Sequence, residues 1–391
     1  MMKIKNIYQK TVPLASQIRN AVIDFSTMTT SVVAVVSDVI REGKPVVGFG
    51  FNSNGRYAQS GILNERIIPR LLNAEEKELL NESGSNFDPF KCWDVMMKNE
   101  KPGGHGDRSV AVGTIDMAIW DLVAKIEQKP LYKLLSERYN NNEADPNVYV
   151  YAAGGYYYPG KDTTGLEDEF KRYLDMGFDT CKMKIGGVEL KDDLTRIEAA
   201  LKVVGEGKFL TVDANGRFDL RTGVKYAEAL EPYKLKWYEE PVDPLDYLSL
   251  SVISETSKTP LATGENIFSL PDSRNLLLYG ELKPERDYLQ MDPVLGYGLT
   301  EYLRILKMLR VFDWSPKRCI PHGGHQFGLH IAAGLGLYGN ESYPEVFLPF
   351  GKFAKSMQLK DGFVKLTDAY GIGYEEVPGI YDIMKSLSKQ L

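Results

Sequence analysis

The chain has 391 residues, of which 43% are hydrophobic and 26% charged, and its formal net charge is −6 at pH 7. This composition is typical of a globular protein too long for one small core, and it argues against the basic surface that a nucleic-acid-binding protein needs. The three cysteines, Cys92, Cys181 and Cys319, form neither a disulfide framework nor a paired zinc motif, which indicates a reducing compartment.

The N-terminal stretch "MMKIKNIYQK" lacks the apolar core of a signal peptide. No run in the chain approaches the ~20 apolar residues of a membrane-spanning helix. We therefore expect a soluble, cytoplasmic protein without membrane contact.

The first third of the chain combines strands and helices. Two β-branched runs joined by a polar turn at Arg41–Lys44 predict a β-hairpin over residues 29–52, which a polar loop follows. Apolar residues at helical spacing predict a helix within residues 109–135, capped at Asp107 or Ser109. Pro130 either ends that helix or starts the next one.

From about residue 147 the pattern changes to short β-rich runs that alternate with helical stretches. The runs lie near residues 150, 183, 212, 239, 264, 290, 321 and 347. Eight such units favour a closed parallel (β/α) barrel. An open doubly wound sheet is the alternative, disfavoured because no GxGxxG follows the first run. The last forty residues lose this rhythm, and we expect them to pack back on the N-terminal region.

Ionisable residues end six neighbouring runs, where a (β/α) barrel places its active site. From the second run to the seventh they are Lys182 with Lys184, Asp213 with Asn215, Glu239 with Glu240, Glu265 with Asn266, Asp292, and His322. Unrelated strands would not all end in this way, so we expect these side chains to form one site.

Three of these carboxylates indicate a metal site. Asp213, Glu239 and Glu265 are 26 residues apart, which predicts the same rung of their strands. Oxygen ligands alone favour Mg²⁺ first and Mn²⁺ second, whereas the alternative is three separate solvated acids. Glu240 would face the opposite side from Glu239, toward the helix layer or a neighbouring side chain.

The lysine pair predicts a proton-transfer function. Lys182 and Lys184 share one face of a strand, and a nearby cation together with burial lowers the pKa of an ammonium group. Two surface lysines at a frayed strand end are the alternative. His322, His325 and His330 have a spacing that would also suit zinc, but we favour structural roles for the last two because they follow the strand end.

Several motifs resemble the enolase superfamily and, within it, the mandelate racemase group. In chain order they are "GTIDMAIWDLVAKIEQKPLYKLL", "KMK", "VDANGRF", "WYEEPV", "ATGEN", "MDP" and "GIGYEEVP". The resemblance implies a (β/α)7β-type (modified TIM) barrel over residues 146–349. It also implies an α+β capping domain over residues 1–145 that residues 350–391 complete.

The resemblance also implies roles for the site residues. Asp213, Glu239 and Glu265 would be the Mg²⁺ ligands, Lys182 and Lys184 would match the family's KxK motif, and Asp292 with His322 would match its Asp–His dyad. Lys184 would remove the proton α to a carboxylate that Lys182 contacts. A protonated His322, oriented by Asp292, would then release the β-hydroxyl.

Three longer stretches look most like the D-tartrate dehydratases of this group. They are "GFNSNGRYAQ", "KPGGHGDRSVAVGTIDMAIWD" and "CIPHGGHQFGLHIAAGLGLYGNESYPEVFLPFG". The expected reaction is therefore that of a hydro-lyase, converting D-tartrate to oxaloacetate. The alternatives are another acid-sugar dehydratase, a racemase or epimerase on the same scaffold, and a barrel that only binds. An amidohydrolase is disfavoured because the first run has no HxH.

A doubly charged substrate would need further contacts beyond the metal. Lys101, in the same glycine-rich loop as His105, and Asn54 with Arg56, in the loop after the hairpin, are candidates from the cap. Asn215 and Asn266 are candidates beside the metal ligands. Barrels of this group commonly form even-numbered homo-oligomers, which we also expect here.

Overall fold

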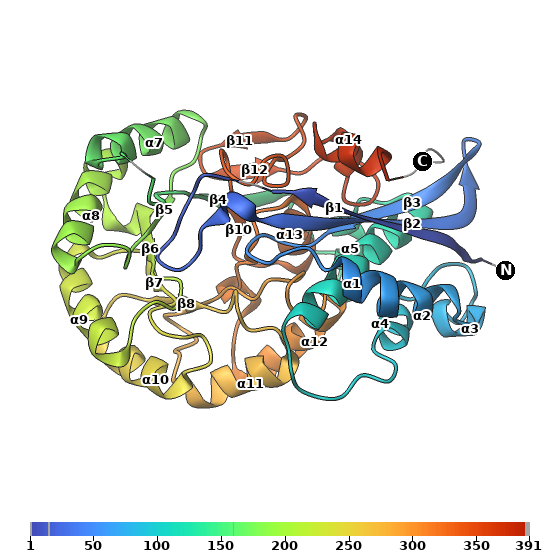
Figure 1. Ribbon diagram of the computed structural model, residues 1–391, viewed down its shortest axis with the longest axis horizontal. Helices are drawn as coiled ribbons and strands as arrows, with labels where there is room; N and C mark the ends of the chain where they lie inside the picture. Colours follow the sequence, from blue (N-terminus) through green and yellow to red (C-terminus); the bar gives the residue numbers. More distant parts are fainter. Residues whose placement is uncertain (1, 15, 159, 388–391) are drawn as a thin grey trace.

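The N-terminal region forms a three-stranded antiparallel sheet. The structure, a computed structural model, describes residues 2–14, 16–158 and 160–387 (Figure 1). The sheet has the order β1 (Ile4–Pro13), β2 (Thr29–Arg41), β3 (Lys44–Phe51). The hairpin predicted over residues 29–52 is confirmed by β2 and β3, whereas the sequence pattern did not indicate β1.

Helices follow this sheet in the chain. They are α1 (Ser60–Ile62), α2 (Ile68–Leu72), α3 (Glu76–Leu79), α4 (Pro89–Met96), α5 (Asp107–Ile126) and α6 (Leu131–Tyr139), with a π-helical stretch (Leu63–Ile67) joining α1 to α2. Pro130 separates α5 from α6, and Gly106 rather than Asp107 or Ser109 is the N-cap of α5. Helix α5 lies directly on β3, where a Cβ at Gly48 would come 2.0 Å from the carbonyl oxygen of Ala118.

A parallel barrel follows. Its strands are β4 (Asn147–Ala153), β5 (Cys181–Lys184), β6 (Leu210–Asp213), β7 (Trp237–Glu239), β8 (Leu261–Thr263), β9 (Tyr288–Leu289) and β10 (Asn340–Ser342). Strands β4 to β9 pair in chain order, and β10 pairs parallel with β4. Between β9 and β10, the seventh barrel position is a single parallel bridge from Leu289 to Cys319. The Glu341 amide of β10 donates to the carbonyl of Pro321 at 3.4 Å, so the ring closes.

The eighth strand differs from the prediction. The apolar run "EVFLPF" near residue 347 is a loop, and β10 lies a few residues earlier. Hydrophobicity misled the prediction because Phe347 and Phe350 are buried by packing against other loops and the cap, Phe347 against Phe25 and Phe350 against Phe51.

Helices surround the barrel, with α7 to α11 forming the rim on the left and lower edges of Figure 1. They are α7 (Thr163–Asp175), α8 (Leu190–Val204), α9 (Leu220–Leu230), α10 (Tyr247–Thr256), α11 (Leu270–Tyr279), α12 (Leu299–Leu309) and α13 (Gln326–Leu335). The cap helix α5 docks on α12 through polar contacts: the Thr300 hydroxyl donates to Asp116 at 2.6 Å and accepts from Trp120 Nε1 at 3.1 Å.

The C-terminal segment contacts both regions. β11 (Gln358–Lys360) and β12 (Phe363–Lys365) form a hairpin, and β12 pairs antiparallel with β4. The chain then returns to the cap before α14 (Ile380–Lys385), where Lys125 Nζ lies 2.6 Å from both Asp121 Oδ2 and Glu375 Oε1. The domain limits at residues 145 and 350 stay a prediction.

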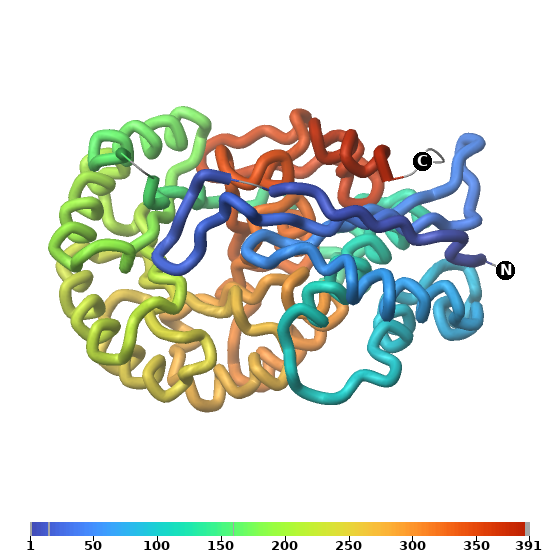
Figure 2. The backbone as a smooth tube through the Cα atoms, viewed as in Figure 1, coloured from blue at the N-terminus to red at the C-terminus, as the bar shows by residue number. Residues whose placement is uncertain are grey.

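The loop between β1 and β2 reaches the carboxyl end of the barrel (Figure 2). There the backbone amide of Tyr157, in the loop after β4, donates to the carbonyl of Arg19 at 2.9 Å. Thus a cap loop covers the barrel mouth, where the strand-end residues lie. Across the described part of the chain, no helix combines the length and apolar character needed to cross a bilayer.

Candidate active site

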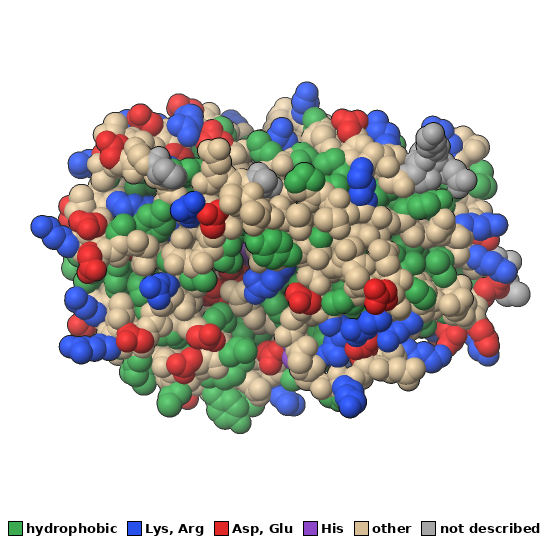
Figure 3. Space-filling model, viewed as in Figure 1, with side chains coloured by type: hydrophobic (Ala, Val, Ile, Leu, Met, Phe, Trp, Pro, Cys, Tyr) green, Lys and Arg blue, Asp and Glu red, His purple; other side chains and the backbone are tan. Residues whose placement is uncertain are grey.

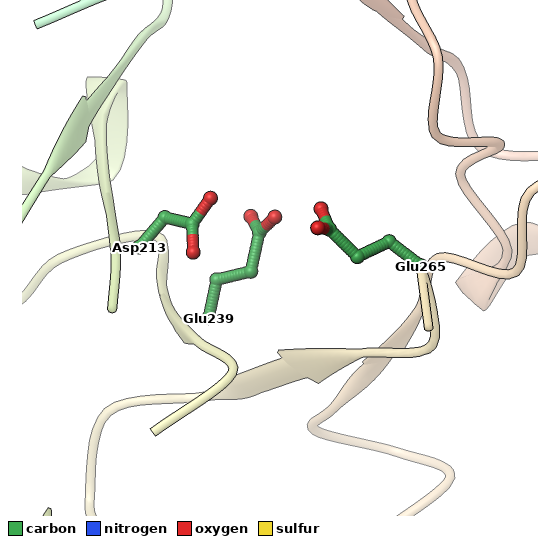
Figure 4. Close-up of side chains that lie close together, drawn as sticks. All are labelled: Asp213, Glu239 and Glu265. Atoms are coloured by element: carbon green, nitrogen blue, oxygen red, sulfur yellow. The ribbon is translucent and has the colours of Figure 1, made fainter. Parts of the chain in front are cut away.

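Three carboxylates converge at the barrel mouth. Asp213 and Glu239 end β6 and β7 and are register partners, and Figure 4 shows both pointing toward Glu265. Each offers an oxygen within 4.8 Å of the others. The prediction of one shared rung is wrong for Glu265, because β8 ends at Thr263 and Gly264 (φ +133°) turns the chain before it. Its longer side chain still reaches the other two.

This is the only such cluster of metal-ligating side chains among the described residues, and it contains Glu239 and not Glu240. Burial and the Asp213 charge raise the pKa of Glu239, although Lys182 opposes the shift. Glu240 is buried next to the cluster and accepts from Asn266 Nδ2 with both oxygens at 3.0 Å. Concentrated carboxylate charge with oxygen donors only is the environment that a hard divalent cation neutralises.

Lys182 is fully buried among carboxylates. Its Nζ lies 2.7 Å from Glu239 Oε1, 2.6 Å from Glu341 Oε1 and 3.3 Å from Asp213 Oδ2. Burial alone would lower the pKa of Lys182, but Glu239 and Glu341 raise it well above its usual value. Lys182 is therefore a fixed positive charge at neutral pH.

Lys184 lies on the same face of β5 and contacts Asp213 Oδ2 at 2.5 Å. Burial and Lys182 both lower the pKa of Lys184, as expected from the sequence, but Asp213 outweighs them and raises it. The protein groups alone therefore do not lower the pKa of Lys184, and the fall predicted with a divalent cation beside it stays a prediction. The reason is that the strand places the ammonium directly against Asp213, and not only beside another lysine.

The histidine and aspartate of the predicted dyad are in contact. His322 Nδ1 lies 2.8 Å from Asp292 Oδ2, and Asp292 Oδ1 accepts from the backbone amides of Val294 and Leu295 at 2.7 and 2.9 Å. Burial opposes the charged imidazolium, but Glu265, Glu341 and Asp292 raise the pKa of His322 to about 10. The ring is therefore protonated near neutral pH.

A cap residue completes the dyad. Ser53, in the loop after β3, donates from Oγ to Asp292 Oδ2 at 2.6 Å. The neighbouring Asn54 donates from Nδ2 to the carbonyl of Gly323 at 3.0 Å, next to His322. The acid side of the site is thus built by the cap and the barrel together.

Sequence reasoning missed Glu341 and Tyr343. Glu341, in β10, is fully buried, and although burial opposes its charge, Lys182 and His322 lower its pKa to about 2. Tyr343 Oη donates to Glu341 Oε2 at 2.9 Å and lies 3.2 Å from His322 Nε2. The sequence signal for Glu341 is the acid in "NES", but the apolar run that follows it predicts the strand a few residues too late.

A cavity of about 190 Å³ opens above these groups. Lys184, Glu265 and His322 line it from the barrel, and Figure 3 shows acidic and histidine side chains in a recess near the middle of this face. Its other lining residues are Asn20, Val22, Ile23, Phe25, Asn54, Gly55, Arg56, Tyr156, Asn215, Asn266, Leu295, Tyr343 and Phe347.

Four predicted substrate contacts line this cavity. Arg56 Nη2 donates to Asn266 Oδ1 at 2.5 Å, and its guanidinium lies 5.0 Å from the centre of the Phe268 ring. The Oδ1 atoms of Asn54 and Asn215 are buried without a hydrogen-bond partner. These two acceptors suit substrate hydroxyl groups, since buried polar atoms without partners are costly.

Lys101 and His105 are not brought to the cavity. Lys101 is exposed, its carbonyl accepts from Arg108 at 2.9 Å, and His105 Nδ1 lies 3.1 Å from Tyr297 Oη. Neither is among the residues that line the cavity.

The two remaining histidines are structural. His325 Nδ1 accepts from the Gly328 amide at the start of α13, and His330 Nδ1 accepts from the Tyr132 amide. Burial lowers the pKa of His325 to about 4 and that of His330 to about 3, so both are neutral. The zinc alternative finds no support, because the described residues offer no histidine cluster.

Comparison with known proteins identifies relatives over the whole chain. The family model described as "Enolase C-terminal domain-like" matches residues 165–377, and "Mandelate racemase / muconate lactonizing enzyme, N-terminal domain" matches residues 7–136. Arabinonate dehydratase of Saccharolobus solfataricus is 29% identical over 90% of this chain and 91% of its own. L-Talarate/galactarate dehydratase of Salmonella typhimurium is 26% identical over 93% and 85%.

Solved structures support the fold. A racemase from Streptomyces coelicolor with bound magnesium superposes with a TM-score of 0.79 at 24% identity, over 99% of both chains. At this level of identity the likeness concerns the fold, a capping domain on a modified (β/α) barrel. The two dehydratases act on acid sugars by name, whereas the Streptomyces protein is a racemase by name. Proteins similar to this chain therefore catalyse more than one reaction.

Proposed function

The chain belongs to the enolase superfamily, within its mandelate racemase/muconate lactonizing enzyme family, and we propose that it is a hydro-lyase of an acid sugar. The observation that carries the proposal is the placement of a lysine and a histidine at the two ends of one carboxylate cluster. Lys184 contacts Asp213, and His322 Nε2 lies 3.4 Å from Glu265 Oε2. Both line the same cavity, so one substrate can meet both.

Asp213, Glu239 and Glu265 fit a divalent cation, Mg²⁺ first and Mn²⁺ second, because their oxygens converge without a nitrogen or sulfur donor. When bound, the cation supplies positive charge that stabilises the substrate carboxylate and offsets the Asp213 charge that raises the pKa of Lys184. Magnesium is also bound in the related Streptomyces racemase.

The side chains then divide the reaction between two ends of the cavity. Neutral Lys184 first takes the α-proton, which leaves the electron pair of that C–H bond as an enediolate of the substrate carboxylate. That electron pair then forms the new double bond as the β C–O bond breaks. The departing hydroxyl leaves as water with a proton from His322, which Asp292 holds through Nδ1 so that Nε2 faces the cavity. Lys182 stays charged and stabilises negative charge at the carboxylate end.

The finer proposal concerns the substrate. A small hydroxy-diacid fits the small cavity, and we propose D-tartrate, whose enol product tautomerises to oxaloacetate. Arg56 is the cation of the cap that lines the cavity, so it suits the second carboxylate better than the distant Lys101. Another acid sugar, or a racemisation in which His322 returns a proton to the α-carbon, is the alternative.

The test is a screen of the purified protein with Mg²⁺ against tartrate stereoisomers and a panel of acid sugars. We expect formation of a 2-keto acid, abolished by EDTA and restored by Mg²⁺. Inversion at the α-carbon without loss of water would support the racemase alternative instead. Ligand binding without turnover, unaffected by EDTA, would identify a binding module and contradict the proposal.

Replacement of Arg56 by methionine tests the diacid proposal. Losing a charge-assisted hydrogen bond is expected to raise KM for the diacid by about 10- to 100-fold, while a monoacid substrate is affected much less. Steady-state kinetics with both substrates measure the difference. Arg172→Met is the control, because Arg172 pairs with Glu345 on the outer surface. If Lys101→Ala raises KM selectively and Arg56→Met does not, the anchor is Lys101.

A further inference from the structure

A polar cluster lies behind the strand that carries Lys184. Arg196, on α8, donates from Nη1 to the carbonyl of Lys184 and from Nη2 to the carbonyl of Gly155, each at 2.7 Å. The Gly155 carbonyl also accepts from the Lys184 amide at 3.2 Å. One guanidinium group therefore ties the end of β5 to the loop after β4.

Asp193, one turn earlier on α8, holds the guanidinium in place. This fully buried carboxylate accepts from Arg196 Nη1 at 3.0 Å and from the Gly186 amide at 2.6 Å. It also accepts from the hydroxyls of Tyr157 and Tyr226 at 2.9 and 3.0 Å. The guanidinium carbon lies 4.1 Å from the centre of the Tyr157 ring. The guanidinium group is therefore held by the Tyr157 ring, by Asp193 and by the two backbone carbonyls. We call Arg196, Asp193, Tyr157 and Tyr226 the α8 clamp.

The two glycines after Lys184 let the chain approach the clamp. Gly186 has a φ of +87°, and a Cβ at Gly187 would come 2.5 Å from the Tyr157 ring. The Gly187 amide donates to Tyr157 Oη at 2.9 Å. The segment "KIGG" is thus shaped to bind the clamp and not only to leave the strand.

We propose that Arg196 is a positioning residue for proton abstraction, acting through the backbone of Lys184. This inference rests on the proposed function, since it concerns the same base. A lysine side chain is long and flexible, so a shift of its backbone also displaces its Nζ from the reacting C–H bond. The clamp grips the carbonyl of the base itself and the neighbouring loop, which carries Tyr156 onto the Lys184 ammonium at 5.2 Å.

The barrel provides a matched control at its other end. Arg286 also donates to two backbone carbonyls, those of Ser254 and Ser257 at 3.1 and 2.9 Å, and pairs with the buried Asp287. Asp287 precedes β9, so this second clamp lies at the amino end of the strands, away from the cavity. Loss of either clamp removes similar contacts, but only one of them holds the base.

The test compares Arg196→Gln, Arg196→Lys and Arg286→Gln. Both glutamine variants are expected to lower the thermal unfolding midpoint. Arg196→Gln alone is expected to lower kcat by about 10- to 100-fold, with KM little changed and α-proton exchange slowed in parallel. Arg196→Lys keeps the charge but cannot donate to both carbonyls from two fixed nitrogens, so its kcat is expected to be as low as that of Arg196→Gln. Three results would each overturn the proposal. They are a wild-type kcat in Arg196→Gln, an equal fall in kcat in Arg196→Gln and Arg286→Gln, and a wild-type kcat in Arg196→Lys.

A second measurement does not depend on activity. Hydrogen–deuterium exchange of the peptide covering residues 181–187 is expected to accelerate in Arg196→Gln and not in Arg286→Gln. Unchanged exchange in Arg196→Gln would overturn the proposal even if the wild-type protein proved inactive on every acid sugar. A wild-type protein inactive in the substrate screen would contradict the proposed function, whereas the exchange measurement tests the α8 clamp by itself.

Discussion

Replacement of Lys184 by alanine is expected to lower kcat for dehydration by about 10²- to 10⁴-fold, the usual contribution of a general base. The variant is also expected to lose exchange of the α-proton with solvent deuterium, because the described residues that line the cavity include no second lysine to take the proton. Proton NMR of the substrate in D₂O, together with steady-state kinetics, measures both effects.

The control for Lys184 is a partly buried lysine at a different place in the same barrel. Lys236 precedes β7 at the opposite end of the barrel and lies 4.6 Å from the centre of the Tyr149 ring. Lys236→Ala is expected to cost stability but to leave exchange and kcat close to wild type. A Lys184→Ala protein that still exchanged the α-proton at the wild-type rate would show that another group is the base.

Replacement of His322 by asparagine is expected to separate the two halves of the reaction. The amide can keep a hydrogen bond to Asp292, which His322 makes at 2.8 Å, but it cannot give a proton to a leaving hydroxyl. Elimination is therefore expected to fall by about 10²- to 10⁴-fold. Exchange of the α-proton through Lys184 is expected to remain detectable, because that step precedes loss of the hydroxyl.

His325→Asn is the matched control, because His325 is buried and neutral and binds the first turn of α13. It is expected to lower the unfolding midpoint and to leave the ratio of exchange to elimination unchanged. If His322→Asn eliminated water at the wild-type rate, the proton donor would have to be another group, and Tyr343, 3.2 Å from His322 Nε2, would be the first to test.

Strand-end reasoning predicted much of the site because a parallel barrel brings its carboxyl ends to one place. Asp213 and Glu239 could be located in this way, since each ends a strand and they are register partners. Glu265 was identified for a partly wrong reason, because it lies beyond β8 and reaches the cluster by side-chain length. Glu341 was missed because a strand of three residues gives a weaker sequence signal than the apolar loop after it.

The cap contacts and the pKa of Lys184 could not have been predicted in the same way. Ser53 and Asp292 are 239 positions apart, and no local periodicity records that they share a hydrogen bond. The pKa of Lys184 depends on a contact of 2.5 Å with Asp213, whereas spacing along the strand showed only the neighbouring Lys182. Both properties arise from tertiary packing between segments distant in sequence.

The hydrogen bond from Ser53 to Asp292 has a consequence for how such a site diversifies. Ser53, Asn54 and Arg56 lie on one short loop. Ser53 and Asn54 brace the His322 side of the site, and Asn54 and Arg56 line the cavity. A mutation that reshapes this loop for a different substrate also disturbs the hydrogen bonds around the acid. A change of substrate range through this loop is therefore expected to alter proton delivery by His322 as well, and a second substitution near Asp292 would be needed to restore it.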